Sequence, residues 1–314
     1  MLEIFAYDKK IVKIDLKDIG KYKDKLLWID CEDLTKEEAE ILKNAFELHQ
    51  LTVEDLLNAN TRIKVEEFPN YLLCVFYTVE NKKKMIELKE LDLILGNNFV
   101  ISSYLKNLEA SEFLKNNQDQ LEKLFAKGPD FILHKIIDFE VDRFFPLLEH
   151  IDEKLYELDE KVAKNPSRHN LDKLLEIKKN IMKIKRLVNP QREKISFLAK
   201  HDYKFISKGS VPYFRDVYDQ FILIAENADA QRDAVTNTYE LYMSTVSHNL
   251  NEIMKMLSII ATIALPLTLI SSIYGTNFKV LPGADSPQGF WMMIVVMTVL
   301  VLFLVHYFRR RGWL

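Results

Sequence analysis

Apolar residues are concentrated near the C-terminal end of the chain. Two runs, Met256–Tyr274 and Phe290–Phe308, each extend over 19 residues without Asp, Glu, Lys or Arg. A helix of that length is about 28 Å long, which is enough to cross the hydrocarbon core of a bilayer. The pattern predicts transmembrane helices at 256–274 and 290–308, joined by an outer loop at 275–289.

The first 107 residues show a different pattern, in which short β-prone runs alternate with helical segments. Thr35–His49 is predicted to be a helix because Thr35 and Glu38 have the spacing of a capping box. Thr52 and Asp55 repeat that spacing at the start of a second short helix, Thr52–Asn58. These features predict an α/β domain at residues 1–107. Strands are expected at Ile11–Ile14, Leu26–Ile29, Tyr71–Val79, Leu91–Leu95 and Phe99–Ser103.

Residues 108–255 are predicted to form long helices, which makes the chain an α+β membrane protein. Tyr213–Leu265 contains 53 residues without Gly or Pro, so one helix of about 80 Å should continue into the first transmembrane span. Such a helix needs partners for its apolar stripe, and copies of the chain would form a homo-oligomeric bundle. Pro190 is expected to kink or split the preceding helix. The earlier helices are expected at Leu108–Lys127, Asp130–Lys164 and Leu171–Lys208.

Basic residues flank the two predicted spans on one side. Lys255 precedes the first span, and the basic tail at 309–314 follows the second, whereas the loop carries only Lys279 and Asp285. Positive residues near spans stay in the cytoplasm, so both termini should be cytoplasmic and the protein should lie in the cytoplasmic (inner) membrane. The formal charge of −3 hides an acidic block at 138–163 and a basic block at 164–208. No nucleic-acid partner is expected, because no known fingerprint accompanies the basic block.

One face of the first predicted span carries small or polar residues at alternating steps of three and four, a 3.5-residue repeat. This stripe predicts either close helix packing or the wall of a pore. Asn251 and Asn277, near its two ends, favour the pore, with Met254, Leu257 and Leu265 as hydrophobic gates. Larger residues beside the stripe should face lipid, namely Ile259, Ile260, Ile263, Leu267 and Ile270. The predicted pore-lining residues are Asn251, Met254, Leu257, Ser258, Ala261, Leu265, Thr268 and Ser272.

The loop begins Tyr274-Gly275-Thr276-Asn277-Phe278, which resembles the Tyr-Gly-Met-Asn-Phe signature of the CorA family of divalent-cation transporters. Pro266-Leu267-Thr268, the Pro212–Asp219 run and the Arg309–Leu314 tail extend the resemblance. It implies a funnel-shaped homopentamer in the lipid bilayer that admits Mg²⁺, with Co²⁺ and Ni²⁺ as further candidates. Two residues depart from the family pattern, because Thr276 replaces Met and Gly283 replaces an acidic residue after the loop proline.

The resemblance also implies roles for individual residues. Gly275, Thr276 and Asn277 would select and capture the hydrated ion, since Mg²⁺ gives up its water reluctantly. Asp216 would be one carboxylate of a regulatory Mg²⁺ site, with Glu80 or Glu87 as its partner. Arg309, Arg310 and Arg311 would form a basic collar at the pore exit. No organic cofactor is implied.

Two alternatives stay open. The first is a Zn²⁺, Co²⁺ or Ni²⁺ transporter of the same fold, although the seven histidines show no metal-ligand spacing. The second is a membrane-anchored coiled-coil scaffold that conducts nothing. An enzyme is not expected, because the sequence has no phosphate-binding glycine loop, nucleophile elbow or HExxH motif.

Overall fold

The computed structural model describes residues 2–58, 61–82, 85–200, 203–279, 281–283 and 286–313. It divides into two compact units. The first unit contains Met1–Lys161 and Ser167–Tyr239, and the second contains Val162–Pro166 and Glu240–Leu314. Asp285, the acidic residue of the predicted outer loop, lies outside the described residues.

The first unit is built on a sheet with the strand order β2-β1-β3-β7-β6-β5-β4. β3 and β7 pair in parallel, and every other neighbouring pair is antiparallel. Each of the five runs expected to be strands lies in this sheet, and β1 and β4 are additional. The strands are β1 (Leu2–Tyr7), β2 (Ile11–Ile14), β3 (Leu26–Glu32), β4 (Lys64–Glu67), β5 (Tyr71–Lys82), β6 (Met85–Gly96) and β7 (Phe99–Tyr104).

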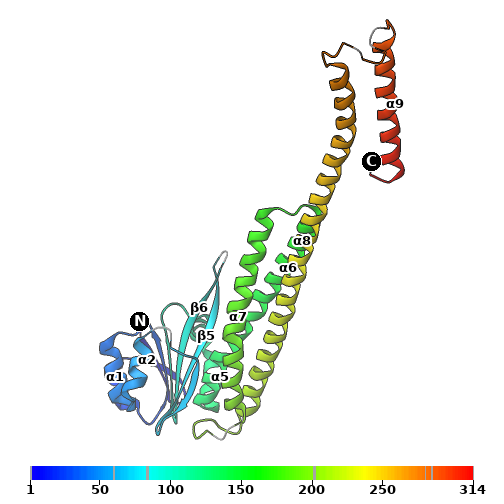
Figure 1. Cartoon of the computed structure of the whole chain (residues 1–314). Helices are drawn as coiled ribbons and strands as arrows, with labels where there is room; N and C mark the ends of the chain where they lie inside the picture. The colour runs from blue at the N-terminus through cyan, green and yellow to red at the C-terminus, as the bar shows by residue number, and fades with distance from the viewer. Residues whose placement is uncertain are drawn as a thin grey trace. The chain divides into compact units, whose positions relative to one another are not determined.

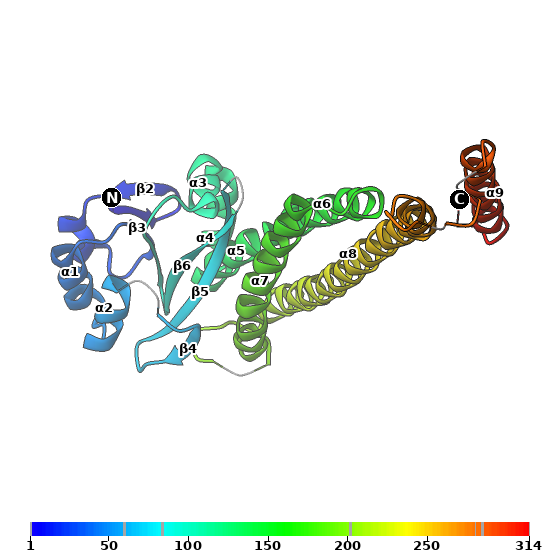
Figure 2. The same cartoon turned by 45° about the horizontal axis from the view of Figure 1, so that its top comes forward.

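Helices cover both faces of this sheet (Figure 2). The helices α1 (Lys36–Phe46) and α2 (Gln50–Leu57) pack on one face, where Leu42 and Val53 join the buried core around Ile29, Leu73 and Ile101. On the other face, α5 (Pro129–Asp142) lies against β3, β5, β6 and β7. Cys31 and Cys74 are buried and unpaired by disulfide, as expected of core residues.

The start of α1 confirms the predicted capping box, whereas the start of α2 does not. The Glu38 N–H donates to the Thr35 hydroxyl at 3.3 Å, and the Thr35 N–H donates to the Glu38 carboxylate at 3.0 Å. α2 begins two residues earlier than predicted, because His49 Nδ1 accepts from the Leu51 N–H at 3.2 Å. Thr52 is instead buried inside the helix, where its hydroxyl lies 2.7 Å from the Tyr71 hydroxyl.

The middle of the chain has more helices than the sequence pattern predicts. The expected helix at Leu108–Lys127 is broken at Asn117, whose backbone leaves the helical region. The expected helix at Asp130–Lys164 is broken at Arg143, because Pro146 lacks the N–H that a continuous helix would need there. The 3₁₀ helix η1 (Leu16–Tyr22) precedes them. The helices are α3 (Glu109–Asn116), α4 (Gln118–Lys127), α5 (Pro129–Asp142), α6 (Phe144–Lys164) and α7 (Arg168–Lys200).

Pro190 does not split α7, which passes through it without a break. The next helix, α8 (Val211–Tyr274), has 64 residues and is also continuous through Pro266 (Figure 1). The N-terminal part of α8 packs into the first unit through the buried side chains of Phe214, Val217 and Phe221. Its last part and α9 (Gly289–Arg310) are both long and apolar enough to cross a membrane. The predicted continuous helix is therefore present, and a helix occupies each of the two predicted spans.

Candidate ion pathway

The C-terminal part of α8 carries the predicted pore stripe on an exposed face. Leu265, for example, is 68% exposed and Met254 is 65% exposed. A residue that lines a pore between copies of a chain must be exposed in a single copy. The stripe meets this requirement because all of its residues are exposed. The eight exposed positions are Asn251, Met254, Leu257, Ser258, Ala261, Leu265, Thr268 and Ser272.

The opposite face of the same helix is partly covered within the second unit. Ile259 is buried, so the expectation that it faces lipid is wrong, whereas Ile260 is exposed. The Lys255 ammonium donates to the Gly312 carbonyl at 3.3 Å, just beyond the end of α9. This contact brings the C-terminal end of α9 to the beginning of the first predicted span, so the basic residues of both lie at one end of the helix pair.

Gly275 allows the chain to turn sharply after α8. Its N–H donates to the Ser271 carbonyl at 2.9 Å. A Cβ at this position would lie 3.1 Å from the same oxygen and 3.6 Å from the Ser272 carbonyl oxygen. Because any side chain would press against the last turn of the helix, glycine suits this position.

Thr276 ends the helix with its side chain. The Thr276 hydroxyl donates to the Ile273 carbonyl at 2.7 Å, and the backbone N–H donates to the same oxygen at 3.2 Å. Carbonyl groups in the last turn of a helix lack partners within the helix, so this side chain satisfies one of them. Thr276, at the position where the resembled signature has methionine, therefore makes a local hydrogen bond at the end of the helix.

Asn277 follows this turn and is exposed. Among the described residues, no hydrogen bond engages its side-chain amide. The Tyr274 hydroxyl donates to the Pro282 carbonyl at 3.0 Å and ties the two sides of the loop together. Lys279 and Gly283 are also exposed, and Gly283 has a positive φ of 79°. The Asn277 amide is thus presented on a constrained turn with its oxygen available to water.

The basic tail begins in the last turn of α9. Arg309, Arg310 and Arg311 are all exposed. The Arg311 guanidinium lies 5.7 Å from the centre of the Tyr307 ring, a cation–π contact. The Trp313 N–H donates to the Phe308 carbonyl at 3.0 Å, so the tail folds back on the end of the helix.

Asp216 lies in the first unit, exposed in an early turn of α8. Its electrostatic neighbours are on α5. Asp138 and Asp142 are four residues apart and therefore share one face of that helix. Burial raises the pKa of Asp142, and the charges of Asp138 and Asp216 raise it further. Asp138 forms an ion pair with Lys135 at 2.7 Å. These three carboxylates influence one another, but among the described residues they do not converge on one position that could hold a metal.

Glu80 and Glu87, the predicted partners of Asp216, are opposite each other in the β5–β6 ladder. Glu80 also forms an ion pair with Lys89 at 3.0 Å. Like charges opposite each other in a ladder repel, and Lys89 offsets part of that repulsion. Asp138 and Asp142 were not among the predicted site residues, although their spacing on a predicted helix was a signal that could have identified them.

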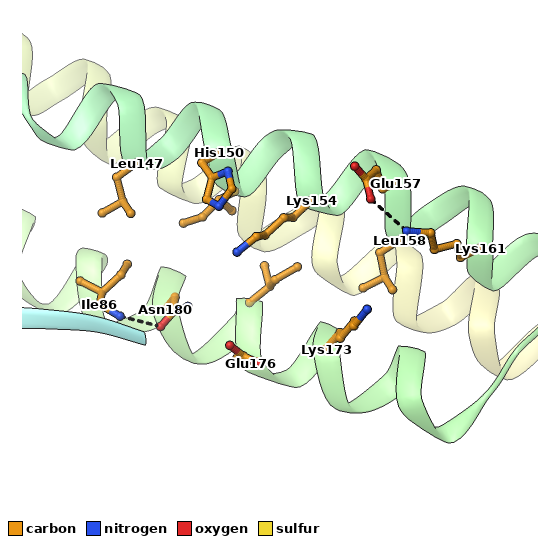
Figure 3. A pocket seen from close by; sticks show the side chains of 12 residues that line it. Ile86, Leu147, His150, Lys154, Glu157, Leu158, Lys161, Lys173, Glu176 and Asn180 are labelled. Atoms are coloured by element: carbon orange, nitrogen blue, oxygen red, sulfur yellow. Dashed lines mark hydrogen bonds and ion pairs between the residues drawn. The ribbon is translucent and has the colours of Figure 1, made fainter. Parts of the chain in front are cut away.

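A separate cleft of about 300 Å³ lies between α6 and α7 beside Ile86 of β6 (Figure 3). The Ile86 N–H donates to the Asn180 side chain at 3.3 Å and anchors α7 to the β5–β6 hairpin. Lys154 and Lys173 point into the cleft, but Glu157 and Glu176 also line it. Charges of both signs give this cleft no clear preference for an anion or a cation.

An uncharged stripe of polar and apolar residues, on a helix long and apolar enough to cross a bilayer, is compatible with a membrane transport protein. Comparison with known proteins agrees. The chain belongs to the CorA family, because the model described as "CorA-like Mg2+ transporter protein" matches residues 23–310.

Several relatives match over most of their length. The cobalt/magnesium transport protein CorA of Thermotoga maritima is 36% identical over 275 residues, which cover 86% of this chain and 78% of the relative. The protein of the same name from Methanocaldococcus jannaschii is 25% identical and covers 98% of both chains. The complete structure of the CorA magnesium transporter from that organism superimposes with a TM-score of 0.90 at 23% identity, covering 100% of this chain and 99% of the other. The predicted family and the predicted fold of the single chain are confirmed.

Proposed function

We propose that the chain forms a homopentameric channel that carries Mg²⁺ into the cytoplasm, with Co²⁺ and Ni²⁺ as further cargo. The observation that carries this proposal is the exposed Asn277 amide, held on a tight turn at the end of a membrane-spanning helix. An amide oxygen can accept hydrogen bonds from the water molecules around Mg²⁺ without displacing them, and Mg²⁺ loses those water molecules reluctantly. A ring of five such amides would select a hydrated divalent ion.

Passage beyond Asn277 follows the exposed stripe of α8. The Thr268 hydroxyl donates to the Ala264 carbonyl at 2.8 Å, which leaves its lone pairs free to accept from water in a second polar ring. Asn251 would form the cytoplasmic ring, and Met254, Leu257 and Leu265 would narrow the path between them. The membrane potential contributes about 2.3 kcal/mol per charge per 100 mV, so a divalent ion gains twice that amount.

The exposed apolar residues of α8 support assembly from several copies. Leu223 in the first unit is 52% exposed, and Leu250 in the second unit is 56% exposed. Large apolar side chains left exposed in a single chain are candidates for contacts with other copies. The contact between Lys255 and Gly312 groups the basic residues of both spans, which supports cytoplasmic termini in the inner membrane.

Regulation is proposed at Asp216. Mg²⁺ bound there would offset the negative charge of nearby Asp142 and hold neighbouring subunits in a closed arrangement. Glu80 or Glu87 of an adjacent subunit would complete the site. Among the described residues of a single chain, no three acidic, histidine or cysteine side chains converge to hold a metal. This finding is consistent with a site shared between subunits.

Influx into liposomes tests conduction. The purified protein is reconstituted, a negative-inside potential is imposed, and Mg²⁺ is followed with an internal dye. Asn277→Ala should lower the rate at least tenfold, whereas Ser286→Ala in the same loop should conduct like the unmodified protein. Hexammine cobalt, a mimic of hydrated Mg²⁺, should block influx. Equal rates for Asn277→Ala and the control would refute the role of the amide.

The same assay separates the two alternatives. Zn²⁺ uptake that exceeds Mg²⁺ uptake would favour the Zn²⁺ transporter. A folded protein that admits none of these ions would favour the scaffold.

Protection from proteolysis tests regulation. Asp216→Asn should raise the Mg²⁺ concentration needed to protect the protein several-fold, because one carboxylate of the cluster is removed. Asp219→Asn, an exposed acid three residues further along α8, is the matched control and should behave like the unmodified protein. If both variants retain normal protection, Asp216 does not bind the regulatory ion.

A further inference from the structure

The Asp92 carboxyl is buried in the first unit without a hydrogen-bond partner at one of its oxygens. Asp92 lies in the middle of β6 and is only 5% exposed. Its Oδ1 atom accepts no hydrogen bond from the described residues. An ionised carboxylate needs donors at both oxygens, and burying one without them is costly. The charge state of Asp92 therefore needs an explanation.

Two potential donors near Asp92 are engaged elsewhere. The Lys64 ammonium forms an ion pair with Asp55 at 2.7 Å. The Tyr104 hydroxyl, which lines the same small cavity as Asp92, donates to Asp30 at 2.7 Å. Neither group donates a hydrogen bond to Asp92, so neither stabilises its ionised form directly.

Glu90 lies two residues before Asp92 on the same face of β6, but its surroundings differ. The Glu90 carboxylate accepts from the Thr61 N–H at 2.9 and 3.1 Å and from the Tyr77 hydroxyl at 3.0 Å. Donors of this kind stabilise a carboxylate ion. Where two carboxyl groups repel each other, the one with donors keeps the negative charge and the one without donors keeps a proton.

Asp92 lies on the face of the sheet that carries α2. The next residue towards the N-terminus, Leu91, lies on the other face beside Ile137 of α5 and Gln191 of α7. A cavity of about 80 Å³ separates Asp92 from the end of α2, and it has room for only a few water molecules. A buried carboxylate ion could not be fully hydrated there. The residues of α2 and its C-terminal end that line the cavity are Leu56, Leu57 and Asn58.

The charged groups around Asp92 are mostly acidic. Burial raises the pKa of Asp92 well above its ordinary value, and the charges of Glu90 and Asp55 raise it further, whereas Lys64 lowers it. The titratable groups that face Asp92 are Glu90 of β6, Asp55 of α2, Lys64 of β4, Tyr77 of β5, Tyr104 of β7 and Asp33 after β3.

We propose that Asp92 is a proton-controlled latch, whose neutral carboxyl keeps the end of α2 packed against β6 and β7. Loss of the proton leaves a buried anion that the small cavity cannot hydrate, so the end of α2 moves away from the sheet and admits water. All of these residues belong to the first unit and are separate from Asp216 and from the candidate ion pathway. The latch therefore does not depend on whether the protein conducts ions.

Linkage fixes the direction of the pH dependence. In the unfolded chain Asp92 ionises near its ordinary pKa of 3.8, whereas in the folded chain it keeps its proton to a higher pH. Between these two values the folded state binds one more proton, so the free energy of unfolding falls as the pH rises. One proton corresponds to about a tenfold change in the unfolding equilibrium constant per pH unit.

Urea unfolding of the full-length protein in detergent, followed by Trp28 fluorescence from about pH 4 to about pH 8, tests the proton. Asp92→Asn keeps the shape of the neutral carboxyl and cannot ionise. The unfolding equilibrium constant of the unmodified protein, divided by that of the variant, should rise by up to about tenfold per pH unit. The other carboxylates cancel in this ratio. Asp24→Asn, an exposed acid before β3, is the matched control and should give a ratio that does not change with pH.

Amide hydrogen exchange tests the movement of α2. At the upper end of the pH range, α2 should exchange several-fold faster in the unmodified protein than in Asp92→Asn, whereas α4 should exchange equally in both. Asp55→Asn removes one facing charge and should end the pH-dependent fall in stability at a lower pH, which keeps the proposal testable if Asp92→Asn fails to fold. A stability ratio for Asp92→Asn that does not depend on pH, or equal exchange of α2 in both proteins, would overturn the proposal.

Discussion

The two units of this chain differ in how far they bury their own apolar side chains. In the first unit, large side chains such as Trp28, Tyr71 and Phe214 are at most 1% exposed. In the second unit, Val162, Ile259 and Phe308 are the buried apolar side chains among the described residues, whereas Leu257, Leu265 and Phe303 are each more than 60% exposed. The first unit can therefore fold through its own contacts, whereas the second needs lipid and other copies of the chain.

The same contrast applies to polar groups. Asp30 in the first unit accepts from Ser102, Tyr104 and Ser111 and forms an ion pair with Lys115 at 2.6 Å. In the second unit, Thr262, Thr268 and Thr298 donate to backbone carbonyls of their own helices. Long-range polar contacts hold the soluble fold, and local ones suit a helix in lipid, where no other partner is guaranteed.

The largest expected difference is between leucines in the two units. Leu93→Ala empties part of a fully buried site in β6 and should lower the free energy of unfolding of the first unit by about 2–5 kcal/mol. Leu265→Ala alters an exposed side chain and should change the free energy of unfolding of the first unit by less than about 0.5 kcal/mol. The same variant should alter Mg²⁺ influx. Denaturant titration in detergent, followed by the fluorescence of buried Trp28, measures the first effect. Similar losses in both variants would break the comparison.

A smaller effect is expected at two glycines. Gly275→Ala places a Cβ 3.1 Å from the Ser271 carbonyl and should lower influx several-fold by distorting the turn that presents Asn277. Gly20→Ala in the first unit meets no atom within 4 Å and should leave both influx and stability nearly unchanged. Liposome influx and thermal unfolding of the two variants make the comparison. Normal influx by Gly275→Ala would show that the turn tolerates a side chain.

The smallest effect concerns an ion-pair group at the edge of the first unit. Hydrogen bonds from Lys115 and Lys13 hold the pKa of Glu3 below its ordinary value of 4.5. The folded state therefore gains stability from ionised Glu3 above pH 4.5, and this gain is lost as the pH falls through the lower folded pKa. Glu3→Gln should lower the free energy of unfolding by less than about 1 kcal/mol at pH 7, and should not change it at a pH below the folded pKa of Glu3. Unfolding curves at several pH values check this, and a cost that does not depend on pH would contradict it.

Much of the fold could be predicted because its signals are local. The two apolar runs, the Thr35 capping box and the long helix without Gly or Pro each depend on neighbouring residues, and all are present in the structure. The residues around Asn277 could be singled out in the same way, because the signature is contiguous. Their role in ion capture remains a proposal that the influx experiment tests.

The sequence alone determined the two membrane-spanning helices, the strand-rich N-terminal part and the candidate pore stripe, because periodicity and capping act within a few turns of the chain. Only the tertiary structure decided that Thr52 bonds Tyr71, that Ile259 is covered, and that Asp216 lies near acids of α5. It alone revealed the unsatisfied oxygen of Asp92 beside a polar cavity. These features join residues far apart in the sequence, and no local pattern encodes which side chains the folded chain brings together.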